Sequence, residues 1–191
     1  AKNVRVQIEA PKIQTCLFTI SGPAPLVIHR MSKKLKDEFE QKMTIGKAAS
    51  SKKKRESVEL EDLYNAGRYR SPQGWDGFHA GAIRNAMISA CRLVNFKMTL
   101  AKLSIWVVAD GCDALEPQIP LVRIYGKPAL QKDMARVQTG QPYITVRPAY
   151  RKWKAKLRIQ FDADQFTPTD ISNLLMRVGT QVGIGEGRPD S

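Results

Sequence analysis

The segment KWKAKLRIQFDADQFTPTDISNLLMRVG (152–179) carries the pattern that determines the architecture of the chain. Its first ten residues alternate between apolar and polar side chains, as a β-strand with one buried face does. The apolar face holds Trp153, Ala155, Leu157, Ile159 and Phe161. The other face holds Lys154, Lys156, Arg158 and Gln160. We therefore expect a strand that buries its apolar side and presents a basic side on the open face of a sheet.

The second half of this stretch predicts a helix. Thr167 is the expected N-cap, Pro168 suits the first helical position, and Asp170 can reach back to complete a capping box. The apolar stripe is Ile171, Leu174, Leu175 and Val178. Gly179 follows this stripe and is the expected stop signal.

Similar patterns extend over the rest of the chain. The clearest helix is predicted over 79–94, where apolar residues form a continuous stripe. Shorter helices are expected after Ser32 and from Ser57 to Tyr64. Strands are predicted at 4–9, 14–20, 103–109, 120–126 and 143–150, with 26–29 resuming the sheet. We expect 103–109 to be buried on both faces and 67–77 to be a loop.

This order of elements predicts an α+β fold. An antiparallel sheet covered on one face by two helices is the ferredoxin-like or RNA-recognition-motif (RRM) arrangement. The core would be formed by residues 1–31 and 76–191, and 32–75 would be a basic insertion with a flexible loop at 46–57. Residues 127–141 have no clean period, which favours a hairpin or a projecting loop.

The charge of the chain points to an anionic partner. Its 191 residues include 31 Lys and Arg against 18 Asp and Glu, a formal net charge of +13. Nucleic acid is the usual partner of such an excess, and an anionic membrane surface is the competing one. The single cysteines Cys16, Cys91 and Cys112 favour neither a disulfide framework nor a zinc site. With no apolar run of membrane-spanning length and no signal core, we expect a cytoplasmic protein.

Cations gather in several segments that could contact phosphate. Residues 52–55 are four consecutive cations in an expected loop, although a solvated loop or a localisation signal would look the same. The segments 67–70 and 146–154 interleave arginine with aromatic residues, and among these Tyr69 and Tyr150 are candidates for stacking. GIGEGRP (183–189) offers glycine amides beside Arg188, although a plain turn is the alternative.

Catalytic patterns find little support. His29 and His79 are far apart in the sequence, and neither has a neighbour with metal-ligand spacing. The pairs Asp162/Asp164 and Asp110/Asp113 read as ordinary turn chemistry. We therefore predict no enzyme, no metal and no cofactor. Metal-free RNA cleavage that uses His79 stays open as an alternative.

The chain resembles the RAMP superfamily in two segments and in the strands between them. The segments are WDGFHAGAIRNAMISACRL (75–93) and the glycine-rich VGIGEGRP (182–189). The likeness is to subunits that form the backbone of CRISPR effector complexes around the guide RNA, and to short phage-encoded relatives. It implies a modified RRM core, an inserted subdomain at 32–75 and a thumb-like hairpin at 127–142. It further implies that the helix carrying Arg84 lies near the RNA, and that a final strand follows the glycine-rich loop. It also implies that copies polymerise along single-stranded RNA, and it adds other effector-complex subunits as further expected partners.

We therefore expect a non-catalytic, single-stranded RNA-binding subunit. The alternatives are a phage single-stranded DNA-binding or annealing protein, an inhibitor that mimics an effector backbone subunit, and a RAMP-type endoribonuclease. The candidate binding residues are Lys52, Lys53, Lys54, Arg55, Arg68, Arg70, Arg84, Arg92, Arg147, Arg151, Lys154, Lys156, Arg158, Gly183, Gly185 and Arg188.

Overall fold

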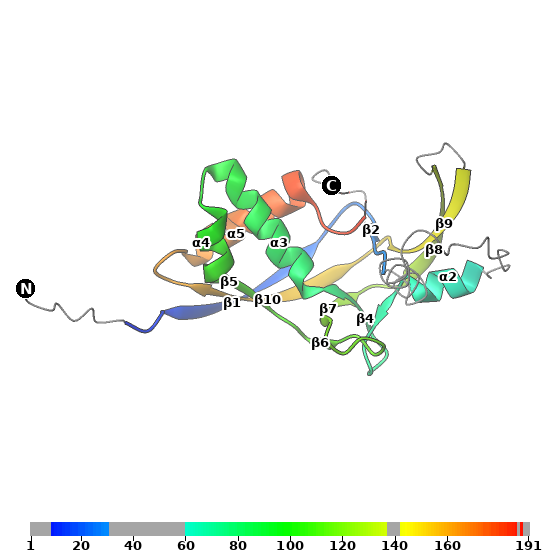
Figure 1. Ribbon diagram of the computed structural model, residues 1–191, viewed down its shortest axis with the longest axis horizontal. Coiled ribbons are helices and arrows are strands. Elements are labelled where there is room, and N and C mark those ends of the chain that lie inside the picture. Colours follow the sequence, from blue (N-terminus) through cyan, green and yellow to red (C-terminus); the bar gives the residue numbers. More distant parts are fainter. Residues whose placement is uncertain (1–8, 31–59, 137–141, 187, 189–191) are drawn as a thin grey trace, which may run out of the picture.

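The computed structural model describes residues 9–30, 60–136, 142–186 and 188, and it has an α+β fold with antiparallel sheets (Figure 1). Its strands are β1 (Ile13–Ser21), β2 (Leu26–Val27), β3 (Tyr69–Arg70), β4 (Asp76–His79), β5 (Ile105–Val108), β6 (Gly111–Cys112), β7 (Pro120–Tyr125), β8 (Pro128–Arg136), β9 (Pro142–Tyr150) and β10 (Lys154–Asp162). Its helices are α2 (Leu60–Ala66), α3 (Ala80–Ala90), α4 (Met98–Ser104) and α5 (Pro168–Arg177), with short turns η2 (Cys91–Val94) and η3 (Val178–Val182).

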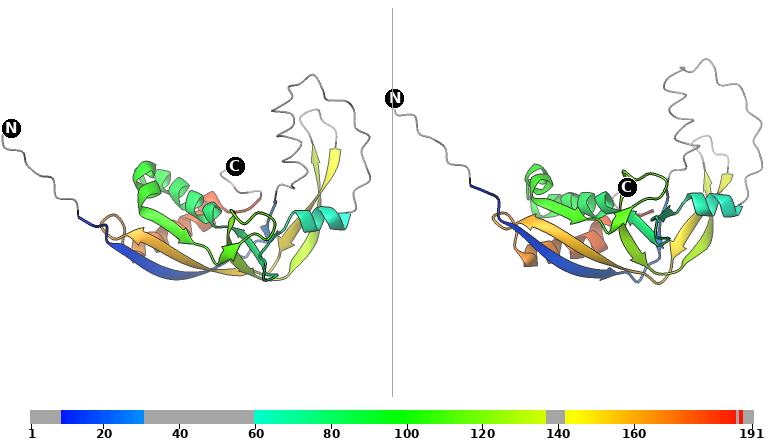
Figure 2. Two further views of the ribbon diagram at one scale, coloured as in Figure 1. Left: turned by 60° about the horizontal axis from the view of Figure 1, so that its bottom comes forward. Right: turned by 90° about the horizontal axis from the view of Figure 1, so that it is seen from below.

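Strand β10 lies at the centre of the main sheet. The strand order is β1-β10-β7-β4-β3, with β5 also paired to β10 and β6 to β7. Arg158 of β10 faces Leu17 of β1 on one side and Val108 of β5 on the other. These strands confirm the predictions at 14–20, 120–126 and 152–161. Figure 2 shows β1 and β10 side by side along the sheet.

Helices α3, α4 and α5 cover one face of this sheet, as Figure 1 shows. The covered side of β10 consists of Ala155, Leu157, Ile159 and Phe161, all at 0% exposure. They join a core with residues of α3 and α5, such as Ile83, Met87 and Ile171, each also at 0%. Burying each of the larger side chains, from leucine to phenylalanine, contributes roughly 1.5–3 kcal/mol. The alternation of β10 therefore produces the two-layer fold, as its sequence predicts.

Helix α5 begins as predicted and ends at Arg177, but a further helical turn follows it. The Thr167 hydroxyl accepts the amide of Asp170 at 3.2 Å, and the Asp170 carboxylate accepts the Thr167 amide at 2.8 Å. The α-helix stops directly before Gly179, as predicted, but the chain does not leave the helical path there, because it continues as the π-helical turn η3 to Val182. Val178 and Val182 are each 4% exposed, so keeping both in the core outweighs the low helix propensity of glycine. Gly183, with φ of 80°, ends the turn.

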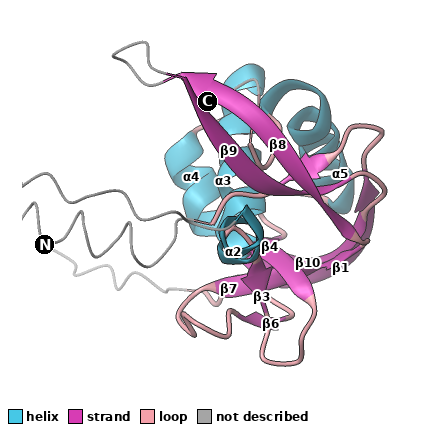
Figure 3. Cartoon of the chain, turned by 90° about the vertical axis from the view of Figure 1, so that its right-hand side faces the viewer, coloured by secondary structure: helices cyan, strands magenta, loops and turns pink. Residues whose placement is uncertain are grey.

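The region predicted to project is a β-hairpin. Strands β8 and β9 pair from Pro128↔Tyr150 to Arg136↔Pro142. Figure 3 shows the two strands in front of the helices, and in Figure 1 they lie at the end of the molecule opposite α4. Residues 26–29 were expected to resume the main sheet. Instead β2 pairs with β9 in a second sheet of order β2-β9-β8.

Two further segments differ from their predictions. The expected strand 103–109 begins only at Ile105, because helix α4 occupies Met98–Ser104, and it is not buried on both faces. The expected loop 67–77 contains the paired strands β3 and β4. The predicted strand at 4–9 and the elements expected over 32–57 lie almost wholly outside the described residues. Among the described residues, no helix is both long and apolar enough to span a membrane.

Candidate nucleic-acid interface

The side of β10 that points away from the helices is basic and exposed. Lys154, Lys156 and Arg158 are exposed, whereas the residues between them are buried. The strict alternation places all three cations on one face. Of the predicted binding residues, these three are therefore brought together as expected. We call the side of the main sheet that carries them the open face.

Pairing across β10 identifies the other side chains of the open face. On the β1 side, Leu17 lies opposite Arg158 and is 65% exposed. On the other side, Tyr125 of β7 lies opposite Lys154, and Trp106 of β5 lies opposite Gln160. Residues directly opposite one another in an antiparallel pair share a face. The row of cations thus has an aromatic residue at each end.

Arg123 adds a fourth cation to the open face. It precedes Tyr125 by two residues in β7, whose intervening residue Ile124 is buried, so Arg123 and Tyr125 point the same way. Its guanidinium carbon lies 4.9 Å from the centroid of the Tyr125 ring and 5.9 Å from that of Trp75. The Lys156 Nζ lies 6.0 Å from the Tyr125 centroid. Tyr125 is therefore surrounded by positive charge.

Asp110 compensates part of this charge. The Arg158 guanidinium lies 3.3 Å from an Asp110 carboxylate oxygen and donates to the backbone oxygen of Ala109 at 2.9 Å. The other Asp110 oxygen accepts the amide of Arg123 at 3.0 Å. Arg158 is thereby oriented along the sheet, and its charge is less available than that of Lys154 and Lys156.

Arg68 and Arg70 lie in a separate cluster around Asp76. Arg68 donates to both Asp76 oxygens, at 2.9 and 2.7 Å, and its side chain is only 12% exposed. Arg70 is more exposed and lies 3.7 Å from Asp76. Tyr150, at 1% exposure, is buried, and burial raises its pKa. It is therefore not available for stacking, contrary to our expectation.

Arg84 and Arg92 lie in the helical layer. Arg84 donates to the backbone oxygens of Lys102 and Ile105, and so holds the junction of α4 and β5. Arg92 is exposed on η2, where its Nε donates weakly to Ser89 at 3.5 Å. Neither arginine joins the three cations of β10, because the sheet separates the helical layer from the open face.

The glycine-rich segment is attached to strands β2 and β9. The Glu186 amide donates to the Val27 oxygen at 3.0 Å, and the Glu186 carboxylate pairs with Arg147 at 2.9 Å. A side chain at Gly185 would place its Cβ 2.6 Å from the Val27 oxygen, and Gly185 has φ of +81°. This close approach requires glycine. The amide of Gly183 is also engaged, since it donates to Val178 at 2.7 Å.

Of the other predicted residues, Arg151 is exposed in the turn between β9 and β10, and Arg188 is exposed near the C-terminal end. Lys52, Lys53, Lys54 and Arg55 lie outside the described residues.

Sequence reasoning missed Arg123, Tyr125, Trp106 and Trp75. The first two had a signal, because the alternation of PLVRIY (120–125) places Arg123 and Tyr125 on one face. The sequence gives no such signal for Trp106, because its strand was expected to be buried on both faces. In fact Trp106 is 36% exposed.

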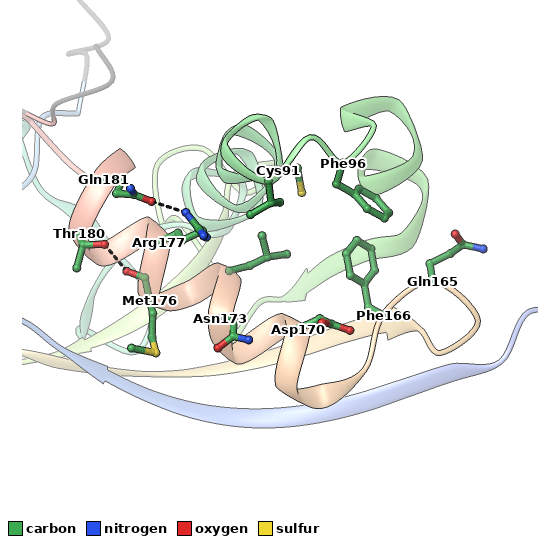
Figure 4. Close-up of a pocket in the computed structure, with 12 residues that line it drawn as sticks. Cys91, Phe96, Gln165, Phe166, Asp170, Asn173, Met176, Arg177, Thr180 and Gln181 are labelled. Carbon is green, nitrogen blue, oxygen red and sulfur yellow. Dashed lines mark hydrogen bonds between the residues drawn. The ribbon is translucent and has the colours of Figure 1, made fainter.

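A groove of about 630 Å³ lies in the helical layer between η2 and α5 (Figure 4). Its floor includes the Phe96 and Phe166 rings, whose centroids are 4.8 Å apart, and the buried Cys91. Burial raises the pKa of the Cys91 thiol, which keeps it protonated. Arg177, on the wall, donates to Gln181 at 3.0 Å. The groove thus combines apolar residues with one carboxylate, Asp170, and one cation, Arg177, and it has no row of cations like that of the open face.

The histidines have structural partners. The Nδ1 of His79 accepts the amide of Gly81 at 2.8 Å and caps helix α3. The Nδ1 of His29 accepts from Arg147 at 3.2 Å. Within the part of the chain that the structure describes, no three His, Cys, Asp or Glu side chains form a group that could hold a metal ion.

Comparison of the chain with protein-family models and with curated protein sequences finds no match.

Proposed function

We propose that this chain is a non-catalytic subunit that binds single-stranded RNA, with several copies assembling along one strand. The observation that carries the proposal is the open face, where Lys154, Lys156 and Arg158 lie between Tyr125 and Trp106. Cations that hold phosphates beside aromatic rings that stack on bases are the usual features of surfaces for single-stranded nucleic acid.

The arrangement of elements supports a modified RRM core. Strand β1, helix α3, strands β5 and β10, and helix α5 occur along the chain in the order of the first five elements of a βαββαβ unit, with other elements inserted between them. The first and third of these strands, β1 and β10, are neighbours, and β5 lies on the far side of β10. In RRM domains the uncovered sheet face receives single-stranded RNA, which is the role we assign to the open face.

The β8–β9 hairpin supports the resemblance to RAMP backbone subunits. Its first strand, β8, falls within 127–142, the segment for which that resemblance implies a thumb. We therefore propose a role like that of the guide-RNA-binding subunits of CRISPR effector complexes, or of a phage-encoded relative. Copies in a row would each contribute one open face to the strand.

Binding without cleavage is supported by the histidines. The His79 imidazole uses its Nδ1 as a helix cap, where a structural role accounts for it. A base for RNA cleavage needs a nitrogen directed at the attacking hydroxyl. The proposal therefore contains no catalytic residue.

Filter binding of an oligouridine over a salt series tests the proposal. Wild-type affinity is expected to fall as salt rises, because bound phosphates displace counterions. Changing both Lys154 and Lys156 to Gln should reduce the slope of log affinity against log salt by about 1.4. The matched control changes Lys97 and Lys102, exposed lysines of the helical layer, to Gln. Wild-type affinity that ignores salt, or an equal loss in the control, would overturn the proposal.

Competition with DNA tests the choice of RNA. Unlabelled oligodeoxyuridine of the same length is added to the RNA complex. We expect the DNA to compete less well than unlabelled RNA. Displacement by DNA at equal or lower concentration would contradict RNA binding and favour the single-stranded DNA-binding alternative.

A further inference from the structure

We propose that Tyr125 and Trp106 are stacking platforms for nucleobases, so that bases as well as phosphates contact the open face. The inference rests on the proposed function and assigns two binding residues that charge alone would not reveal. Both residues are 36% exposed, although neighbours in their strands, Ile105 and Ile124, are buried. An exposed aromatic ring on a sheet that also carries cations offers a flat surface to a base.

The strand register places the two rings at separate positions. Tyr125 lies opposite Lys154, and Trp106 lies opposite Gln160. These β10 partners are six residues apart, which corresponds to about 20 Å at roughly 3.3 Å per residue. The rings would therefore stack on two different nucleotides, and Lys156 and Arg158 lie between them to hold the linking phosphates.

The cations around Tyr125 suit such a complex. In the free protein, Arg123 lies 4.9 Å and Lys156 lies 6.0 Å from the centre of the ring. Cation–π contacts at exposed positions are weak, so they yield readily to a stronger partner. A bound nucleotide can replace these contacts. Its phosphate would attract the cations of Arg123 and Lys156, and its base would stack on the Tyr125 ring.

Trp106 provides the second platform in a different setting. Indole has the largest aromatic face among the side chains and is well suited to stacking. Its cross-strand partner Gln160 carries an amide that can both donate to and accept from a base edge. Every base has a face that can stack, so the two platforms imply little sequence preference. They do imply a requirement for unpaired bases.

The test compares oligouridine with an abasic oligomer of equal length and charge. The variants are Tyr125→Ala and Trp106→Ala, with Tyr125→Phe and Trp106→Phe to retain an aromatic ring. Leu103→Ala, at a 73% exposed position of α4, is the control. Circular dichroism and thermal unfolding confirm that each variant is folded before its affinity is measured.

We expect each alanine variant to bind oligouridine at least about fivefold more weakly than wild type, since stacking contributes about 1–3 kcal/mol per base. The slope of affinity against salt should not change, because no phosphate contact is removed. The phenylalanine variants and Leu103→Ala should stay within about twofold. Wild type should bind the abasic oligomer more weakly, and the alanine variants should bind it as wild type does.

Two outcomes separate this inference from the proposed function. If wild type binds both oligomers equally with a normal salt slope, and the alanine variants match it, stacking is overturned while RNA binding stands. If wild type binds neither oligomer, the proposed function itself is overturned.

Discussion

Two regions of this molecule are rich in cations but differ in what surrounds them. On the open face, Lys154 and Lys156 project from β10 into solvent. In the region around β3 and the loop before β7, Arg30 pairs with Asp113 at 3.1 Å and Glu116 at 2.8 Å, and Arg68 grips Asp76. The net charge of +13 counts both groups alike. Only the structure shows that the first group is available to a ligand.

The difference follows from burial. The side chain of Arg30 is 3% exposed and that of Asp113 is 1% exposed. Each charge is therefore stabilised by its partner, because a buried charge without a partner is strongly destabilising. The lysines of β10 need no such compensation because water solvates them. We therefore expect substitutions in the first region to change affinity, and substitutions in the second to change stability.

Arg30→Ala should produce the largest effect. It leaves Asp113 buried without its cation, which costs about 3–5 kcal/mol of unfolding free energy. Urea denaturation followed by circular dichroism measures this loss. The fraction that remains folded should bind oligouridine as wild type does. If the variant were as stable as wild type but bound oligouridine weakly, Arg30 would act in binding and not in stability, which would contradict the comparison between the two regions.

Gly185→Ala should come next, with a loss of about 1–3 kcal/mol. The substitution imposes a side chain at φ of +81°, close to the Val27 oxygen. The same denaturation experiment measures the loss. The salt slope of RNA binding should be unchanged if this segment is structural. A reduced slope would show that the glycine-rich segment contacts phosphate, as predicted from the sequence.

Thr167→Ala should cost about 1 kcal/mol at neutral pH by removing a helix cap. Hydrogen bonds from the Thr167 side chain and amide lower the pKa of Asp170 below its ordinary 3.8. The folded pKa is below the unfolded one, so this contribution is present above pH 3.8 and is lost as pH falls through the folded value. The gap between wild type and variant should therefore narrow in acid, as thermal unfolding at several pH values would show. A gap that widens in acid would contradict this assignment.

Arg158→Gln should have the smallest effect on binding among the cations of β10. Asp110 lies 3.3 Å from the guanidinium and already compensates part of its charge. We expect the salt slope to fall by less than the roughly 0.7 of a fully available cation. A loss larger than that of Lys156→Gln would mean that Asp110 moves away when RNA binds.

Much of the fold could be predicted from local pattern. The alternation over 152–161 and the cap at Thr167 identify β10 and α5, because buried faces and caps depend on neighbouring residues. The π-helical turn η3 after α5 could not be predicted, since the burial of Val182 is a tertiary effect. Helix α4 was missed for a related reason. Its Leu103 is 73% exposed, so the run that looked like a buried strand was partly a surface helix.

The candidate site was predicted in part. Lys154, Lys156 and Arg158 follow from a period of two within one strand. Tyr125 and Trp106 come from other strands, and only the register with β10 brings them to the same face. Arg68 and Arg84 show the converse, because no local pattern reveals that Asp76 or two backbone oxygens will hold a guanidinium.

The most direct test of the central claim is photo-crosslinking with an oligouridine that carries 4-thiouridine at successive positions, followed by mass spectrometry of the linked peptides. We predict cross-links in the peptides that contain Tyr125, Trp106 and Lys154–Asp162, competed by unlabelled RNA and reduced at high salt. Cross-links confined to α3, η2 and α5 would contradict the account, because they would place the RNA on the helical layer instead of the open face.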